Sequence, residues 1–288
     1  MTRQPLLARH AEDLLGVAVA ATAPVAGGDV ATATKLRMAN GVLAVMKTRA
    51  HAPSGFFEAE AAGLRWLAET TPDGGVAVPE LLGADADCVI LRWVEPARPT
   101  PDAAEDLGRR LARTHAAGAA TWGADHDGFI AWLPLPHAPA PTWAEFYATR
   151  RVLPYLRMAR DRGAIGEREA ALVEAVLPRL AALVPEEPPA RLHGDLWNGN
   201  VLWGAHHETY VIDPAAHGGH RETDLAMLAL FGLPHLSRVI AAYDDTVPLA
   251  DGFEERVPLH QIHPLLVHAC LVGGGYGARA AACAARYL

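Results

Sequence analysis

The stretch RLHGDLWNGN, residues 191–200, decides how the rest of this chain is interpreted. Its last six residues hold one aspartate and two asparagines, and the stretch lies between the apolar segments PPA and VLW. Asp195 and Asn200 have the spacing D-x-x-x-x-N, and His193 lies shortly before the aspartate. Asp213 ends the segment TYVID further along the chain. This order of carboxylate and amide oxygens is typical of a loop that performs phosphoryl transfer.

The chemistry of phosphoryl transfer explains why these residue types occur together. One carboxylate must accept the proton of the attacking hydroxyl, and the pattern assigns this role to Asp195. Mg²⁺ on a triphosphate prefers hard oxygen ligands, which Asn200 and Asp213 supply. As a structural alternative, these residues would be turn formers and a helix cap. The full pattern HGDxxxGN followed by IDP is far more specific than an isolated D-x-x-x-x-N, so we favour a catalytic loop.

The composition limits the class of protein. The chain has 288 residues, of which 51% are hydrophobic and 20% are charged, so it can form one large domain or two modest ones with a buried core. The net charge of -8 argues against general nucleic-acid binding, which needs a basic face. Three cysteines without a CxxC pair argue against a disulfide framework and favour a reducing cytoplasm.

The N-terminal segment LLGVAVAATAPVA, residues 14–26, is apolar enough to resemble the core of a signal peptide. The acidic pair Glu12–Asp13 precedes it where a signal peptide needs positive charge, so we expect a first helix that ends near Leu15 and then a strand. The chain has no long uninterrupted apolar run, so no membrane span is expected. The 14 histidines lack the HExxH pattern, so we expect no structural zinc.

Residues 1–95 read as a small sheet that carries one helix. Two β-rich runs flank the turn signal ANG at 39–41. The spacing of apolar residues predicts a helix over 54–70, with Ser54 as its N-cap. Residues 76–96 read as strand, turn and strand. The apolar positions that define the helix are Phe57, Ala61, Leu64 and Leu67.

Residues 96–288 read as mostly helical. The proline-containing segment WVEPARPTP, residues 93–101, is the expected connection to the first part. Strands first and helices second predict an α+β fold with two lobes: a small N-terminal antiparallel sheet lobe and a larger helical C-terminal lobe. We expect helices near 101–117, 142–160, 166–183 and over most of 222–287, with short strands at 200–203 and 209–213.

Lysine is rare in this chain, because only Lys35 and Lys47 are lysine among 25 basic residues. Lys47 ends the apolar strand GVLAVMK, where a compact ammonium suits contact with phosphates better than a planar guanidinium. Glu60, in the following helix, is the expected partner of this ammonium. Glu58 is a rival partner, but it lies on another helix face and we expect it to be solvated.

The segment GGDVATAT, residues 27–34, precedes the strand that ends at Lys47. Its turn, with Gly27, Gly28 and Asp29, is expected to lie over the phosphates through backbone N–H groups. The glycines do not follow the GxGxxG pattern, so this segment alone is weak support.

Taken together, these segments resemble the fructosamine/ketosamine-3-kinase family, within the protein-kinase-like and aminoglycoside-phosphotransferase-like group. The resemblance covers nearly the whole chain, and its specific part is HGDLWNGN with IDPAxxxGxRExDLAM. The matching stretches, in the family's order, are FFEAEAAGLRWL, LGRRLARTH, DGFIAWLP with TWAEFYATRRVLPYL, LHGDLWNGNVLW, VIDPAAHGGHRETDLAMLALFG and LVGGGYGARA.

The resemblance implies a protein-kinase-like fold in which residues 1–95 form the ATP-binding lobe and residues 96–288 the catalytic and substrate-binding lobe. ATP and Mg²⁺ would bind between them. Asp195 would be the base, Asn200 and Asp213 the Mg²⁺ ligands, and Lys47 with Glu60 the phosphate-positioning pair.

Other site residues follow from the same resemblance. The segment RWVE, which contains Trp93, Val94 and Glu95, would be the hinge whose backbone meets the adenine. Trp197 would stack on the substrate sugar, or alternatively pack between the lobes. Asn198 stands where the family often has serine, so the contact at the substrate edge is expected to differ.

Two further expectations concern regulation and support. Glu222 and Asp224 are expected to support the catalytic loop and cap a helix. Some relatives carry a redox-active cysteine in the glycine-rich loop, but this chain has none there, and Cys88 falls in a strand expected to be buried. Thiol switching is therefore not expected.

The leading functional hypothesis is an ATP-dependent kinase that phosphorylates a sugar hydroxyl of small-molecule or protein-linked ketosamines, as in fructosamine or ribulosamine 3-phosphorylation. One alternative is a phosphotransferase for an aminoglycoside, choline or another amino alcohol, with an acidic pocket built from residues of 217–260. Another is a non-catalytic pseudokinase, which the complete set of catalytic residues argues against. We expect a cytoplasmic monomer or weak dimer without nucleic-acid or membrane partners.

Overall fold

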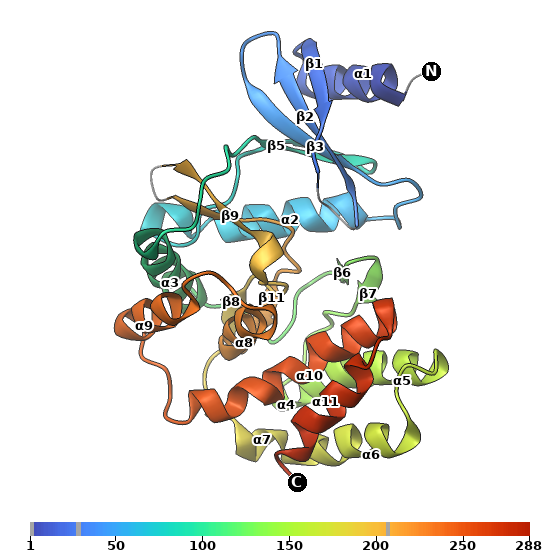
Figure 1. Cartoon of the computed structure of the whole chain (residues 1–288), viewed down its shortest axis with the longest axis vertical. Coiled ribbons are helices and arrows are strands. Elements are labelled where there is room, and N and C mark those ends of the chain that lie inside the picture. The colour runs from blue at the N-terminus through green and yellow to red at the C-terminus, as the bar shows by residue number, and fades with distance from the viewer. Residues whose placement is uncertain (1–2, 27–29, 206–207) are drawn as a thin grey trace.

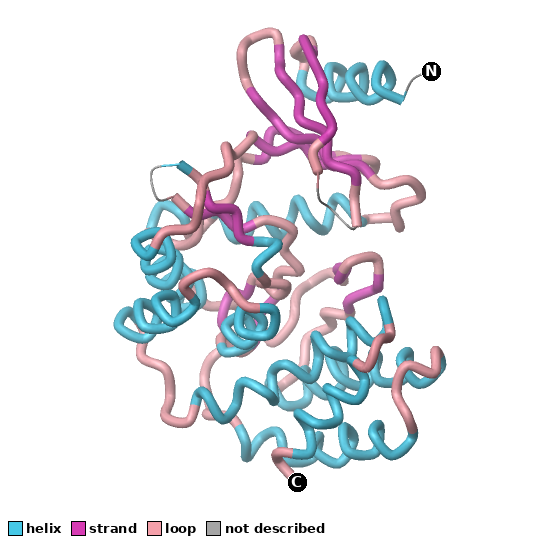
Figure 2. Tube along the Cα trace, viewed as in Figure 1, coloured by secondary structure: helices cyan, strands magenta, loops and turns pink. Residues whose placement is uncertain are grey.

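The computed structural model describes residues 3–26, 30–205 and 208–288. An antiparallel sheet of five strands forms the upper part of the molecule in Figure 1, and most helices lie below it. Figure 2 shows the same separation, with long strands in the upper part and only short strands among the lower helices. The predicted α+β fold, with an N-terminal sheet and a helical C-terminal part, is confirmed. Within the described ranges, every helix is too short or too polar to cross a membrane.

The N-terminal part follows the predicted order of elements. The sheet has the strand order β1-β2-β3-β5-β4, and the first helix ends at Leu15 as expected. The element bounds are α1 Arg3–Leu15, β1 Val19–Pro24, β2 Thr32–Met38, β3 Leu43–Thr48, α2 Phe56–Ala68, β4 Leu81–Ala84 and β5 Cys88–Arg92, with a short 3-10 helix at Thr71–Asp73.

The two faces of this sheet have different neighbours because side chains alternate along a strand. One face is covered by α1 and buries Leu36, Ala44 and Met46. Cys88 lies in the same buried cluster, as predicted. The opposite face carries Lys47, so the alternation directs this charged side chain away from the apolar cluster and toward the other part of the molecule.

Helix α2 confirms the predicted apolar face but not the predicted cap. Ser54 is exposed and makes no capping hydrogen bond, because α2 begins only at Phe56. Gly55 precedes it with φ 81°, and the Phe56 N–H donates to the Pro53 carbonyl in a tight turn. The turn replaces the expected side-chain cap. The predicted apolar residues Phe57, Ala61, Leu64 and Leu67 are all buried.

The C-terminal part is mostly helical. The two predicted short strands appear as β9 and β10, whereas β6, β7, β8 and β11 were not predicted. Its elements are α3 Pro101–Ala116, β6 Gly128–Ile130, β7 Leu133–Leu135, α4 Trp143–Phe146, a π-helix Tyr147–Val152, α5 Leu153–Asp161, α6 Glu167–Val176, a 3-10 helix Leu177–Arg179, α7 Leu180–Leu183, β8 Ala190–Leu192, a 3-10 helix Asn198–Asn200, β9 Val201–Trp203, β10 Thr209–Val211, β11 His217–Gly219, α8 Glu222–Phe231, α9 Leu236–Thr246, α10 Phe253–Val272 and α11 Tyr276–Ala285.

Helices α3 and α9 pack closely, and a glycine makes the close approach possible. A Cβ atom added at Gly108 would lie 2.2 Å from the Val239 carbonyl oxygen. Leu107 and Leu111 are buried in the same cluster as Val239. Their helix also carries His115, so this packing fixes the position of a side chain that matters for the catalytic loop described below.

We expect Gly108→Ala to lower the free energy of unfolding by about 2 kcal/mol, because the added methyl group pushes α3 away from α9. The helix propensity of alanine acts in the opposite direction by up to about 1 kcal/mol. Urea unfolding followed by circular dichroism measures the change. Arg109→Ala, on the partly exposed side of the same helix, is the control with an expected change below about 0.5 kcal/mol. An unchanged unfolding midpoint for Gly108→Ala would contradict the close packing.

Candidate active site

The loop between β8 and β9 carries the HGDLWNGN sequence and makes a tight turn at its start. Gly194 has φ 84°, and a Cβ atom there would lie 2.1 Å from the Ala215 carbonyl oxygen. Only glycine fits this combination of left-handed backbone and close approach. The turn brings Asp195 into the space between the two parts of the molecule.

Asp195 and Asn200 contact each other directly across this loop. The Asn200 amide nitrogen donates to the Asp195 carbonyl oxygen at 2.8 Å and to its carboxylate at 3.2 Å. Because both bonds use the amide nitrogen, the Asn200 side-chain oxygen remains available as a ligand. The D-x-x-x-x-N spacing thus places a carboxylate base candidate beside a free hard oxygen.

Lys47 joins three segments of the chain in one ion cluster. Its ammonium donates to Glu60 of α2 at 2.6 Å and also to Asp213, which follows β10. Asp213 adopts φ 56°, a left-handed conformation that aspartate tolerates better than most residues. The structure therefore brings together the predicted Lys47–Glu60 pair and the predicted metal ligand. Glu58 is exposed, as expected.

The charges of this cluster shift its pKa values. Burial opposes the charge of Lys47, but the carboxylates of Asp213 and Glu60 outweigh it and hold the pKa of the ammonium above its usual range. Burial and the nearby charge of Asp213 raise the pKa of Asp195 to about 7, although the hydrogen bond from Asn200 acts in the opposite direction. Asp195 is therefore a more basic carboxylate than an exposed aspartate, as a general base requires.

The catalytic loop is held from below by Asp224. Its carboxylate accepts the backbone N–H groups of His193 at 2.7 Å and Gly194 at 2.9 Å, and it contacts His115 Nε2 at 3.1 Å. Burial disfavours this carboxylate, but the hydrogen bond from His115 and the neighbouring groups outweigh burial and hold the pKa of Asp224 below its usual value. Asp224 therefore supports the loop as predicted.

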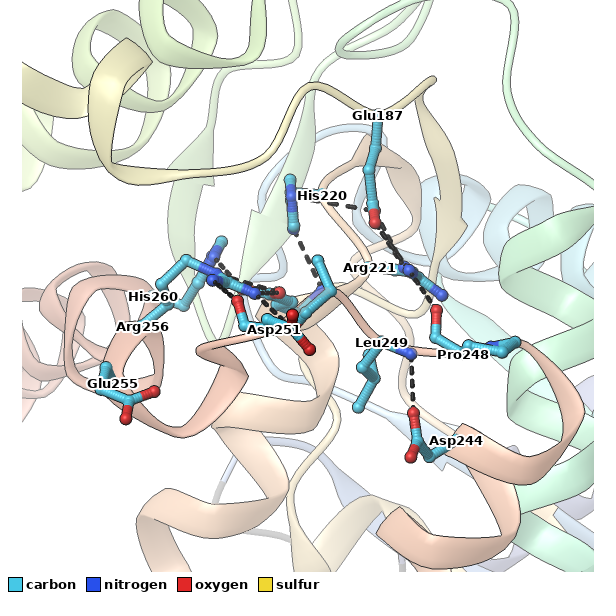
Figure 3. Close-up of polar contacts among 12 residues, drawn as sticks. Glu187, His220, Arg221, Asp244, Pro248, Leu249, Asp251, Glu255, Arg256 and His260 are labelled. Atoms are coloured by element: carbon cyan, nitrogen blue, oxygen red, sulfur yellow. Dashed lines mark hydrogen bonds and ion pairs between the residues drawn. The ribbon is translucent and has the colours of Figure 1, made fainter.

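Glu222 contacts α10 through Arg256 and His260, two residues that Figure 3 labels. Its carboxylate pairs with Arg256 at 2.6 Å and lies 3.3 Å from His260 Nε2. His220 Nδ1 accepts the Glu222 N–H, so a neutral His220 carries its proton on Nε2. The bidentate guanidinium occupies Glu222, and we interpret the group as an ion-pair network that joins α8 to α10. Neither Glu222 nor Asp224 makes the capping hydrogen bond predicted for this helix.

A cleft of about 1140 Å³ lies between the two parts and contains the ion cluster. Its volume is sufficient for a nucleotide and a second small molecule, because typical small-molecule sites occupy roughly 300–1,000 Å³. The predicted site residues that line it are Lys47, Glu60, Trp93, Val94, Asp195, Trp197, Asn200 and Asp213.

Two predicted contacts lie away from this cleft. Glu95 is not among its lining residues, because its exposed carboxylate instead accepts the Trp93 indole N–H at 2.7 Å and pairs with Lys35 at 3.5 Å. Asn198 is exposed and does not line the cleft either. The predicted phosphate contacts of Gly27, Gly28 and Asp29 fall on residues outside the described ranges.

Trp197 lies at the edge of the cleft and is 36% exposed. Its ring meets Phe231 of α8 edge to face at 6.0 Å, and it lies so close to Gly199 that a Cβ atom there would be 2.4 Å from the ring. Both neighbours belong to the C-terminal part. Of the two alternatives for Trp197, the exposed position at the cleft favours contact with a substrate over packing between the lobes.

The cleft also contains residues that the sequence analysis missed. His268 lines the cleft, with its ring 4.7 Å from Phe231 and 5.1 Å from Tyr276. Asp125 and Trp132 line it from other segments. No local pattern marks these residues, because they come from separate elements. The acidic residues of 217–260 that were considered for a substrate pocket do not line this cleft.

The donor set fits Mg²⁺. The side-chain oxygens of Asp213 and Asn200, beside the Asp195 carboxylate, are hard ligands on one wall of the cleft, and no cysteine or imidazole lies among these three. Such a set favours Mg²⁺ over softer metals, and the adjacent Lys47 ammonium is suited to bind the phosphates that accompany the ion.

Comparison with known proteins identifies relatives along the whole chain. Residues 4–288 match the model of a family described as fructosamine kinase. A crystal structure from Thermobifida fusca YX-ER1, named "putative fructosamine-3-kinase", is 48% identical with a TM-score of 0.92, and 98% of each chain is covered.

Curated relatives point in the same direction. A Thermus thermophilus protein named "Probable ketoamine kinase" is 35% identical over 88% of both chains. An Arabidopsis thaliana protein named "Protein-ribulosamine 3-kinase, chloroplastic" is 31% identical over 88% of this chain and 78% of its own.

The raised pKa of Asp195 predicts that this residue destabilises the metal-free fold. Its charged form is disfavoured in the folded protein, so the cost begins above the unfolded carboxyl pKa of about 3.9 and is complete above the folded value of about 7. We therefore expect Asp195→Asn to raise the melting temperature by about 2–5 °C near pH 8 without metal. The difference should vanish near pH 4. Calorimetry measures both conditions.

The exposed Asp161 on α5 provides the matched control, since Asp161→Asn removes a charge far from the cluster. Its melting temperature should follow the wild type at both pH values. A lower melting temperature for Asp195→Asn near pH 8 would show that the carboxylate stabilises the fold and would contradict the assigned pKa direction.

Proposed function

Because the chain belongs to the fructosamine kinase family of phosphotransferases, we propose that it transfers phosphate from ATP to the 3-hydroxyl of a ketosamine sugar. The observation that carries the proposal is the single cleft in which Lys47, Glu60 and Asp213 lie beside Asp195 and Asn200. Every group that phosphoryl transfer requires is present there, which argues against a non-catalytic pseudokinase.

In the proposed mechanism, Asp195 accepts the proton of the attacking sugar hydroxyl. The hydrogen bond from Asn200 orients this carboxylate, and the raised pKa favours proton uptake. Lys47, held by Glu60, positions the phosphates. Asn200 and Asp213 would hold Mg²⁺, which supplies neutralisation of charge on the triphosphate. Activity is expected to fall as Asp195 becomes protonated at low pH.

We further propose that residues 1–95 form the nucleotide-binding lobe and residues 96–288 the catalytic lobe. The Trp93 N–H is already used, since it donates to the Leu43 carbonyl at 3.0 Å. Within the described residues the Val94 N–H has no such partner, and Val94 lines the cleft, so it is the hinge donor available to an adenine ring.

For the acceptor, we propose that Trp197 packs on the sugar ring. Trp197 follows Asp195 closely in the sequence. Its partly exposed ring lines the cleft. His268 lines the same cleft, and Phe231 packs against both the Trp197 ring and the His268 ring, so the two lining rings share one aromatic neighbour; an aromatic surface suits the apolar face of a sugar. The Arabidopsis relative's name adds a ribulosyl amine to the fructosyl amine as a candidate acceptor. Free and protein-linked ketosamines share this chemistry, and we place the reaction in the reducing cytoplasm.

The lysine identity at position 47 is predicted to be essential. The planar guanidinium of Lys47→Arg does not fit the position of a compact ammonium between Glu60 and Asp213. We expect kcat/KM to fall at least about tenfold, which corresponds to roughly 1.4 kcal/mol of transition-state stabilisation. A coupled assay of ADP formation measures kcat/KM for ATP when ATP is varied at a saturating ketosamine concentration.

The other lysine of the chain is the matched control. Lys35 lies 4.0 Å above the Trp93 ring and pairs with Glu95, contacts that arginine reproduces well. Lys35→Arg should change kcat/KM by less than about twofold. Full activity of Lys47→Arg would show that Lys47 does not position the phosphates.

The acceptor class is tested by offering a fructosyl amine, a ribulosyl amine, free fructose and an aminoglycoside under identical conditions. We expect transfer to one or both ketosamines and little to the others. Trp197→Ala should raise KM for the ketosamine about tenfold more than KM for ATP, because the ring is placed to contact only the acceptor. Phosphate transfer is quantified by mass spectrometry. Preference for the aminoglycoside would instead support the amino-alcohol alternative.

A further inference from the structure

The β6–β7 hairpin belongs to the C-terminal part in sequence, yet its side chains contact the N-terminal part. In Figure 1 it lies below the N-terminal end of α2 and to the right of β9. Phe129 of β6 meets Phe56 of α2 with ring centres 5.3 Å apart. Trp132, in the turn between the strands, lies 5.4 Å from the guanidinium of Arg49. The hairpin therefore bridges the two parts of the molecule on the side opposite the hinge.

Arg49 connects this hairpin to Val30 on the wall of the cleft. It lies two residues after Lys47 and donates from its guanidinium to the Val30 carbonyl oxygen. Val30 itself lines the cleft, and so does Lys47, to which the proposed function assigns the phosphates. Among the described residues the buried Arg49 Nε has no hydrogen-bond partner, so the Val30 carbonyl and the Trp132 ring are what hold this guanidinium.

The base of the hairpin is anchored firmly in the C-terminal part. The His137 N–H donates to the Asp127 carboxylate at 2.7 Å across the base, and the Tyr155 hydroxyl of α5 donates to the Pro134 carbonyl at 2.8 Å. The tip, in contrast, is open: Ala131 has φ 51°, and the Trp132 side chain is 38% exposed although it lines the cleft. A fixed base and an open tip allow Trp132 to hold Arg49 without being buried itself.

We propose that Trp132 is a positioning residue that closes the cleft over the phosphates through Arg49, and we call the Val30–Arg49–Trp132 contact the cleft latch. The inference rests on the proposed function. The latch joins the cleft wall at Val30 to the hairpin at Trp132, so that the transferring phosphoryl group is shielded from water on the side opposite Val94.

Shielding matters because water competes with the sugar hydroxyl for the same phosphorus atom. When water attacks, the bond from the γ-phosphorus to the ADP oxygen breaks, and ADP and inorganic phosphate form in place of the phosphorylated sugar. A closed cleft excludes this side reaction. Loss of the latch should therefore change the product ratio, which a purely structural role of Trp132 would leave unchanged.

The experiment measures inorganic phosphate and phosphorylated ketosamine in the same reaction for the wild type, Trp132→Leu and Trp132→Phe. We expect Trp132→Leu to raise the ratio of inorganic phosphate to phosphorylated sugar at least about fivefold, because leucine has no aromatic face for the guanidinium. Trp132→Phe keeps such a face and should restore most of the coupling. Melting temperatures and circular dichroism establish that each variant is folded.

Arg49 provides an independent arm of the same test. Arg49→Gln should raise the ratio of inorganic phosphate to phosphorylated sugar to a similar extent. The double variant of Arg49→Gln and Trp132→Leu should add little, since each single change already removes the same contact between Arg49 and Trp132. Arg37→Gln on β2 is the matched control, because Arg37 is exposed on the neighbouring strand. If Trp132→Leu fails to fold, the Arg49→Gln and Trp132→Phe results decide the question alone.

The outcomes for the cleft latch and for the proposed function are separable. A wild-type product ratio in Trp132→Leu and Arg49→Gln, with transfer to the ketosamine intact, would overturn the latch and leave the kinase assignment in place. Absence of transfer by the wild type to any ketosamine would overturn the proposed acceptor. In that case the latch still predicts faster ATP hydrolysis in both variants than in the wild type, and unchanged hydrolysis would reject it.

Discussion

The ammonium group of Lys47, held between the carboxylates of Glu60 and Asp213, is the interaction on which the site depends. It joins β3, α2 and the segment after β10, although Lys47 and Asp213 are 166 residues apart. Removing one charge from a largely buried cluster leaves its partner uncompensated, which costs several kcal/mol. The cleft walls are therefore connected through the same charges that the proposed chemistry uses.

Below this cluster, a second buried carboxylate keeps the catalytic loop in place. Asp224 accepts hydrogen bonds from two backbone N–H groups of the loop and contacts the ring of His115, so these partners compensate its buried negative charge. Asp195, just above, is the opposite case: burial and Asp213 raise its pKa. The fold thus stabilises the charged form of the supporting carboxylate Asp224 and disfavours the charged form of the base candidate Asp195. Active sites commonly lose stability in this way for the sake of activity.

Local patterns predicted much of this arrangement. The spacing of apolar residues located α2, and the apolar run before Lys47 indicated a strand. The spacing of Asp195 and Asn200 lies within a single short loop, so it could be recognised from a few neighbouring residues. The sequence failed where backbone geometry decides: Gly55 replaced Ser54 at the start of α2. The same limit applies to His268, whose place beside Phe231 depends on how α8 and α10 pack.

The sequence by itself determined the strands and the helix of the N-terminal part, the helical character of the C-terminal part and the residue types that could carry phosphoryl transfer, because side-chain periodicity and short loop spacings act over a few neighbouring residues. Only the tertiary structure decided which of these groups meet. His115 reaches Asp224 across 109 residues, and Arg49 reaches Trp132 through the packing of a hairpin against the other part of the molecule. Such contacts depend on the relative placement of whole elements, which is set by burial summed over the entire core and is not written in any local pattern.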